Sequence, residues 1–216
     1  VKKVPDEETL KQKLDLVDMK KLQINEKNKT VFLEESGMAI DLGGIAKGYA
    51  TDKVNEIFIK NGIISSVISL GGNVSVAGKK EDGSKWKVAI QDPLNKEGYA
   101  GVLYVEDTSV VTSGGYQRFF EENGKTYHHI IDPKTGMPAD TGLLSVTIVC
   151  KNSTKADGLS TSVFIAGLEK GWQMWKDSQD FGIVFITDEK EIYVTPDIAD
   201  IFEIDANAGY TLCSMP

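Results

Sequence analysis

The stretch LLSVTIVCKNSTKADGLSTSVFIAGLEKGWQMWKDSQDFGIVFIT, residues 143–187, decides the fold class. LLSVTIVC at its start and FGIVFIT at its end are rich in β-branched and apolar residues, which predicts two buried strands. Between them, residues 156–177 carry apolar side chains at helical spacing, and these predict one long helix. The apolar positions of that helix include Leu159, Val163, Leu168, Trp172 and Trp175.

The flanking sequence adds more strands than helices. Asn123-Gly124, between two short strand-like runs, is a strong hairpin signal. We therefore expect an α+β fold, with mixed but largely antiparallel sheets packed against helices, as one domain over residues 1–216. The expected elements are a helix within 5–20, two strands within 22–43 that turn at 26–29, a helix at 46–60, strands on both sides of Gly71-Gly72, a hairpin tip at 81–84, and strands at 85–90, 101–107, 109–114 and 191–198.

One arrangement occurs twice. A Gly-rich loop, a helix, an Asn-Gly or Phe-Gly break and a Val/Ile-rich strand follow one another at 41–70 and again at 156–187. Two interpretations stay open: an internal duplication of an α+β unit, or the ordinary alternation of elements in chains that mix helix and sheet.

Composition excludes several classes of protein. The net charge of −8 argues against a general nucleic-acid binder, because a phosphate backbone requires a basic surface. No apolar run approaches the roughly 18 residues of a membrane span. Cys150 and Cys213 are too few for a disulfide framework and lack metal-ligand spacing. The chain starts at Val1 in a charged amphipathic stretch without a signal peptide, so we expect it to be N-terminally incomplete.

The segment ADGLSTS, residues 156–162, is the first candidate site. Asp157 and Thr161 are four positions apart and share one face of the predicted helix. Two oxygen donors at this spacing suit a hard cation such as Mg²⁺, which takes few protein ligands and fills its shell with water and phosphate oxygens. The competing interpretation is structural: Thr154 as N-cap with Asp157 three residues later would stabilise the helix without a metal.

The segment DLGGIAKGYATD, residues 41–52, is the second candidate. Gly43, Gly44 and Gly48 allow backbone to approach a ligand closely, and the following helix directs its first N–H groups toward that ligand. Lys47 supplies a point charge suited to a phosphate or a flavin carbonyl oxygen. The pattern is neither the P-loop nor the dinucleotide-fold fingerprint. By itself, such a segment is more often a helix-entry turn than a site.

The segment YHHIIDPKTGMP, residues 127–138, is the third candidate. His128 and His129 are the two histidines of the chain and alternate faces at a strand end, so one must point inward. A strand-end histidine beside the Asp-Pro-Lys-Thr-Gly turn is a candidate acid–base group near neutral pH. Other loops could border the same pocket. They contain Gly71, Gly72, Ser113, Gly114 and Arg118.

Taken in order, DLGGIAKGYATD, SLGGNVSVAG, TSGGYQRFF, HHIIDPKTGMP and ADGLSTS resemble the motifs of the ApbE family, the FAD:protein FMN transferases. Each motif is weak alone, but five in this order across about residues 37–165 are specific. The resemblance implies the family's α+β fold and a magnesium-bound FAD whose pyrophosphate is split. It further implies that FMN passes to a Thr or Ser hydroxyl of an acceptor protein and that AMP is released.

The resemblance also implies roles for individual residues. Asp157 and Thr161 would bind the metal together with a main-chain oxygen at Gly44. His129 would lie against the pyrophosphate and assist proton transfer, with His128 as the open alternative, and Asp157 would serve catalysis as the metal anchor. The contacts of the flavin nucleotide would be Asp41, Lys47 and Ile130.

Partners and location follow from the same resemblance. The expected partners are FAD and an acceptor flavoprotein, without nucleic acid, and with a membrane contact only through an N-terminal anchor outside this chain. The expected location is extracytoplasmic, as a lipoprotein. Two departures from the family are Gly115, where many relatives carry an acidic residue, and the missing N-terminal region with its Met-Gly-Thr-like strand. An Mg²⁺-dependent FAD pyrophosphatase and a non-catalytic FAD-binding protein remain as alternatives.

Overall fold

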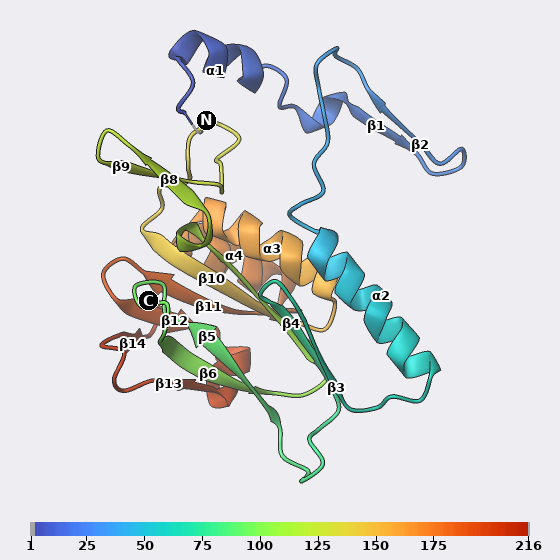
Figure 1. The fold of residues 1–216 in the computed structure, drawn as a ribbon, viewed down its shortest axis with the longest axis vertical. Coiled ribbons are helices and arrows are strands. Elements are labelled where there is room, and N and C mark those ends of the chain that lie inside the picture. The colour runs from blue at the N-terminus through green and yellow to red at the C-terminus, as the bar shows by residue number, and fades with distance from the viewer. Residues whose placement is uncertain (1–2, 216) are drawn as a thin grey trace.

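A seven-stranded sheet lies at the centre of the computed structural model, which describes residues 3–215 (Figure 1). Its strand order is β14-β12-β11-β10-β7-β4-β3, and all neighbours are antiparallel except β12 and β14. The strands are β3 (Ser66–Leu70), β4 (Asn73–Ala77), β7 (Thr108–Gly114), β10 (Leu143–Cys150), β11 (Gly182–Thr187), β12 (Glu191–Val194) and β14 (Thr211–Cys213).

The two faces of this sheet are covered differently. Helices α3 (Ser153–Ala166) and α4 (Leu168–Ser178) pack on one face, and α2 (Ala46–Lys60) packs against α3 and reaches β3 and β4. The other face packs against a three-stranded sheet of β13 (Phe202–Ile204), β6 (Tyr99–Val105) and β5 (Trp86–Gln91). No helix within residues 3–215 is both long enough and apolar enough to cross a bilayer.

Strand β11 shows why the sheet is buried on both sides. Successive side chains of a strand point to opposite faces. Ile183 and Phe185 accordingly join the core beneath the helices, whereas Val184 and Ile186 join the core beneath the smaller sheet. All four side chains are fully buried. A continuous apolar run such as GIVFIT is what a strand between two packed layers requires.

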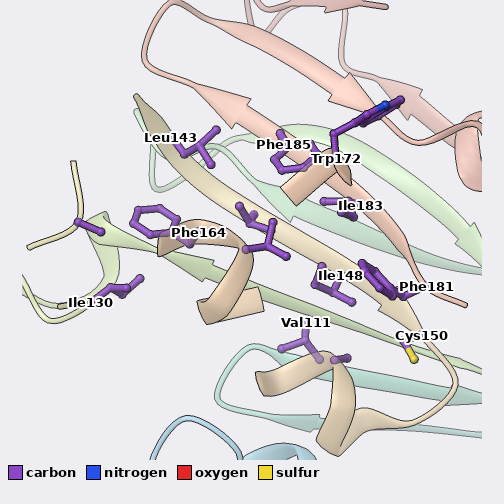
Figure 2. Packing of buried hydrophobic residues seen from close by; sticks show 14 residues of the cluster. Val111, Ile130, Leu143, Ile148, Cys150, Phe164, Trp172, Phe181, Ile183 and Phe185 are labelled. Carbon is purple, nitrogen blue, oxygen red and sulfur yellow. The ribbon is translucent and has the colours of Figure 1, made fainter. Parts of the chain in front are cut away.

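The core under the helices is continuous from β7 to α4 (Figure 2). Phe164 of α3 and Phe185 of β11 are its largest fully buried side chains. Burying an aromatic or large aliphatic side chain contributes about 1.5–3 kcal/mol, so this layer fixes α3 firmly against the sheet. Other members of this core include Val111, Ile130, Leu143, Ile148, Trp172, Phe181 and Ile183.

Smaller elements surround this body. The hairpin of β8 (Phe119–Glu122) and β9 (Lys125–His128) turns at Asn123 and Gly124, both with positive φ. Helix α1 and the hairpin of β1 and β2 lie at the end of the molecule away from the central sheet (Figure 1). The bounds are α1 (Glu7–Leu14), β1 (Leu22–Asn25) and β2 (Thr30–Leu33), with 3₁₀ turns at Met19–Lys21, Gly115–Gln117 and Pro196–Ile201.

The predicted α+β class is confirmed, as are the helix at 46–60 and the Asn-Gly hairpin. The single helix predicted over 156–177 is wrong, because α3 and α4 are separated at Gly167. Its φ of 83° is a left-handed conformation that glycine adopts without a steric penalty. The Thr141 hydroxyl donates to the Phe164 carbonyl, one of the last acceptors of α3. This bond helps the helix to end there.

Three further expectations differ from the structure. The turn at 81–84 is not a hairpin tip, because β4 and β5 on its two sides belong to different sheets. The strand predicted at 191–198 ends at Val194, and Pro196 begins a 3₁₀ turn. The two similar units at 41–70 and 156–187 do not occupy equivalent positions, since β3 lies at a sheet edge and β11 in the interior.

Candidate active site

A cavity of about 1030 Å³ opens where the predicted motifs meet. It lies between the start of α2, the start of α3 and the base of the β8–β9 hairpin. All seven residues predicted for the site line it: Asp41, Gly44, Lys47, His129, Ile130, Asp157 and Thr161. Gly71, Gly72, Ser113 and Arg118, which were expected to border the same pocket, line it too, whereas Gly114 is not among the lining residues.

We call the cavity residues of segment 41–47 and of α3 the helix wall. Asp157 is the buried carboxylate of this wall. The side chain is only 5% exposed. Its Oδ2 accepts a hydrogen bond of 2.8 Å from the Gly48 N–H in the first turn of α2. Gly48 permits this contact, since a Cβ there would lie 2.2 Å from the Ser153 carbonyl oxygen and 2.8 Å from the Asp157 Cβ. Helices α2 and α3 therefore touch backbone to backbone beneath the cavity.

Gly48 lies in the first turn of α2. The N-cap of this helix is Ile45, so the Gly48 N–H is one of the first N–H groups, which have no partner within the helix. The Asp157 carboxylate accepts from this N–H. Gly44 precedes the helix and lines the cavity, and among residues 3–215 no hydrogen bond reaches its carbonyl oxygen.

Thr161 lies one turn after Asp157, and its side chain contacts a residue of the central sheet. Its hydroxyl is 3.1 Å from the Ser113 hydroxyl of β7, which is 2.8 Å from the Ser160 hydroxyl. Ser160 in turn donates to the Asp157 carbonyl. This chain of hydroxyl groups ties the exposed end of Thr161 to a buried strand, so its position is determined by the core.

The competing interpretation, in which Thr154 is the N-cap and Asp157 stabilises the start of its own helix, is wrong. Asn152, rather than Thr154, is the N-cap of α3, and its side chain accepts a hydrogen bond from the Lys155 N–H. Asp157 is the fifth residue of the helix, and no acidic residue lies in the first turn. The carboxylate therefore does not cap its own helix. It caps α2 instead, from a neighbouring element.

Two other predicted residues hold the loop that leads into α2. The Asp41 carboxylate accepts a hydrogen bond of 2.6 Å from the Gly43 N–H, which closes a tight turn. The Lys47 ammonium donates to the Gly71 carbonyl at 3.3 Å. Lys47 thereby connects the two glycine-rich loops across the cavity, and its charge stays at the cavity surface.

The opposite side, which we call the hairpin wall, is formed by Arg118, His129 and Ile130. Both the backbone N–H of His129 and its ring Nδ1 are bonded to the Arg118 carbonyl, at 3.1 and 3.2 Å. A carbonyl oxygen only accepts, so Nδ1 must carry the proton. In the neutral ring Nε2 is then unprotonated and free to act as a base. His129 is exposed and lines the cavity.

His128 has the opposite environment. Its Nδ1 accepts from the Ile130 N–H and its Nε2 contacts the Ala139 carbonyl, so both nitrogens have internal partners. The ring packs edge-on against Phe164. Burial lowers the pKa of His128 below its ordinary 6.5, although the Ala139 contact opposes this shift. The expectation that one histidine points inward is confirmed, and that histidine is His128.

His128 also explains Gly115, the departure from the family pattern. A Cβ at Gly115 would come within 2.8 Å of the imidazole ring. An acidic side chain at this position therefore requires a different placement of the neighbouring histidine. In this chain the imidazole occupies the space in which such a side chain would begin.

Several cavity residues were not predicted. Gln91 at the end of β5 and Lys96 in the loop between β5 and β6 line the cavity together with Tyr116, Gln117 and Ile165. Asp92 supports that loop: it is buried and accepts hydrogen bonds from Leu94 N–H and from the Tyr210 hydroxyl at 2.6 Å. The Asp-Pro pair after the β5 strand could have marked this turn, but the sequence gives no sign that it faces the other motifs.

The donor set of the helix wall suits a hard cation. Within residues 3–215 no three His, Cys, Asp or Glu side chains cluster as a metal site. The available donors are instead oxygens of three kinds: the Asp157 carboxylate, the Thr161 hydroxyl and the open Gly44 carbonyl. Mg²⁺ is held in this manner, by one or two carboxylates with phosphate oxygens and water completing the shell. The residues present therefore fit the metal that the resemblance implies.

Comparison with known proteins identifies the family of this chain. The model of the ApbE family matches residues 1–185. The chain is 37% identical to the FAD:protein FMN transferase of Treponema pallidum and 35% identical to one from Klebsiella pneumoniae. These alignments cover 91% and 89% of this chain but only 58% and 59% of the relatives.

Solved structures give the same result. The ApbE protein of Thermotoga maritima superimposes with a TM-score of 0.83 at 32% identity, over 92% of this chain and 64% of that one. The flavin transferase ApbE of Vibrio cholerae gives 0.82 at 27% identity, over 93% and 64%. Both likenesses cover more than nine tenths of this chain, and together with the family match they show that the chain belongs to the ApbE family.

Proposed function

We propose that this protein transfers FMN from FAD to a Thr or Ser hydroxyl of an acceptor protein and releases AMP, in a reaction that requires Mg²⁺. The observation that carries the proposal is the convergence of all seven predicted residues on one cavity. Its volume is at the upper end of the roughly 300–1,000 Å³ range of small-molecule pockets, which suits a large dinucleotide. The names of the relatives support the same activity.

The charges that line the cavity match a diphosphate. Lys47 on the helix wall and Arg118 on the hairpin wall face the cavity together with Lys96. The chain as a whole has a net charge of −8, so the positive charge at the cavity comes from these three side chains and not from the overall composition. When bound to Asp157, Thr161 and the Gly44 carbonyl, a divalent cation supplies neutralisation of the charge that develops on the phosphate oxygens. Arg118 and Lys47 add fixed positive charge around the same group.

Group transfer requires a bond exchange at the FMN phosphorus. The acceptor hydroxyl oxygen forms a new P–O bond, the P–O bond to the bridging oxygen breaks, and AMP leaves with that oxygen. The hydroxyl proton must be removed, and His129, which lines the cavity and whose Nδ1 is bonded to the Arg118 carbonyl, can accept it at Nε2. From the imidazolium the proton passes to the AMP phosphate or to water.

Mass spectrometry tests this function. The chain is incubated with FAD, Mg²⁺ and a Thr-containing acceptor protein. The expected product carries the mass of one FMN less one water, and AMP appears in equal amount. FMN and AMP without modified acceptor would indicate the pyrophosphatase instead, and FAD that stays intact and bound would indicate a binding protein.

The location of the protein is a separate proposal. We infer from the family resemblance that it acts outside the cytoplasm as a lipid-anchored protein, with the anchor on residues that precede this chain. The chain spans slightly less than three fifths of the relatives from Treponema pallidum and Klebsiella pneumoniae. Fractionation of cells that express the full gene product, with detection of acyl modification, tests this location.

A further inference from the structure

Asp52 of α2 is bonded to the first turn of α3 by three hydrogen bonds. Its Oδ1 accepts from the Ser153 N–H at 2.8 Å, and its Oδ2 accepts from the Thr154 N–H at 2.8 Å and from the Thr154 hydroxyl at 2.5 Å. The first N–H groups of a helix have no partner within the helix. Asp52 therefore satisfies two of these groups in α3 from outside that helix.

This contact is the counterpart of the one between Asp157 and Gly48. Gly48 and Asp52 are four residues apart on α2, and Ser153 and Asp157 are four residues apart on α3, so each pair lies on one helix face. The two links join the helices in antiparallel order. In each, a carboxylate of one helix meets the positive end of the other, where a negative charge is favourable.

The two links together determine where the cavity-facing oxygens lie. Asp52 fixes the start of α3 along α2, and Asp157 then meets the Gly48 N–H one turn later. If α3 slid or rotated along α2, the Gly48 N–H would lose its acceptor and the Asp157 carboxylate would lose its fixed orientation.

We propose that Asp52 is a positioning residue for the metal-binding carboxylate of Asp157; this inference rests on the proposed function. The N-cap residue of α3 is Asn152, whose side chain accepts from the Lys155 N–H, and Asp52 accepts from two other N–H groups of the same turn. What Asp52 adds is the connection from α3 to α2. Asp52 itself is not among the residues that line the cavity.

Three variants separate positioning from general stability. Asp52→Asn keeps an acceptor for Ser153 but turns an NH₂ group toward the Thr154 N–H. Thr154→Val removes only the contact between the Thr154 hydroxyl and Asp52. It tests the same link if Asp52→Asn does not fold. Asn152→Ala is the matched control, because it removes a cap of α3 without touching the connection between the helices.

Two measurements are made on each protein. One is the Mg²⁺ concentration for half-maximal FAD binding, followed by flavin fluorescence without acceptor. The other is the hydrogen-exchange rate of the Gly48 amide by NMR. For Asp52→Asn we expect the Mg²⁺ requirement to rise about tenfold or more and the Gly48 amide to exchange faster. Thr154→Val should show a smaller change in the same direction. Asn152→Ala should lower the melting temperature and leave both quantities near the wild-type values.

The outcomes distinguish this inference from the proposed function. Wild-type Gly48 exchange and Mg²⁺ dependence in Asp52→Asn would overturn the positioning role, and so would equal changes in Asn152→Ala. If the wild type shows no Mg²⁺-dependent FAD binding, the proposed function fails. The Gly48 exchange rates then still decide whether Asp52 orients Asp157.

Discussion

The helix wall and the hairpin wall of the cavity are built on different principles. On the helix wall, Asp157 is buried and one of its oxygens is bonded to backbone, so its orientation is set before any ligand binds. On the hairpin wall, His129 is exposed and held only through one carbonyl, with Nε2 free. A metal anchor benefits from a rigid carboxylate, whereas a proton carrier needs access to both substrate and solvent. The helix wall is therefore suited to hold a metal ion, and the hairpin wall is suited to carry a proton.

Replacing Asp157 by Asn tests the helix wall and should have the largest effect. The amide oxygen can still accept from the Gly48 N–H, so the fold is kept while the charge is lost. We expect FMN transfer to fall about 10³-fold, because the cation that neutralises the phosphates loses its carboxylate. Transfer assays over a range of Mg²⁺ concentrations measure this.

Asp157→Ala is less informative, because it also leaves a buried N–H without a partner, which costs about 1–3 kcal/mol. Asp82→Asn, in an exposed turn, is a suitable charge control. If Asp157→Asn transfers FMN at the wild-type rate and with the same Mg²⁺ dependence, the helix wall does not bind the metal.

Replacing His129 by Gln tests the hairpin wall. We expect kcat to fall about 10²-fold with FAD affinity little changed, because the base is lost while the binding charges remain. His128→Gln is the neighbouring control: its ring bonds to Ala139 inside the protein, so the loss should appear in thermal stability instead. Steady-state kinetics and FAD titration separate the two. An effect of His129→Gln on affinity alone would make it a binding residue.

A Cβ at position 48 tests whether the close contact of α2 and α3 is required. In Gly48→Ala the new methyl group would lie 2.2 Å from a backbone oxygen, so the helices must move apart. We expect about 2 kcal/mol of lost unfolding free energy together with weaker Mg²⁺-dependent FAD binding. Gly44→Ala is the stability control, since a Cβ there meets nothing within 4 Å. Equal unfolding midpoints in urea for both variants would contradict the packing role of Gly48.

The sequence predicts the cavity better than it predicts the contacts within it. Glycine loops, the histidine pair and the Asp–Thr spacing are local patterns, and the seven site residues that the family resemblance selected from them all line the cavity. The bond between Asp157 and Gly48 joins positions 109 residues apart, and no local pattern encodes it. Periodicity predicted Asp157 and Thr161 on one face but could not show that the carboxylate caps a different helix.

Other features that the sequence did not predict also depend on contacts between distant parts of the chain. Gly167 is compatible with a continuous helix in the sequence, but in the structure its φ is 83°, and Thr141, from a loop before β10, donates to the Phe164 carbonyl at the end of α3. Gln91 and Lys96 line the cavity because the smaller sheet folds over the central one. Such tertiary arrangements override local propensity, so they had to come from the structure.

The pH dependence of stability distinguishes the two adjacent histidines with the smallest expected effect. Burial lowers the folded-state pKa of His128 below 6.5, so the unfolded chain binds more protons in the range between the two values. The stability that His128 contributes is therefore fully present above pH 6.5 and is lost as the pH falls toward the folded-state pKa. Urea midpoints measured between about pH 7.5 and 5.5 should decrease as the pH falls in the wild type and in His129→Gln. The decrease should be less steep in His128→Gln. Equal slopes in all three proteins would contradict a protonation of the half-buried His128 that is linked to unfolding.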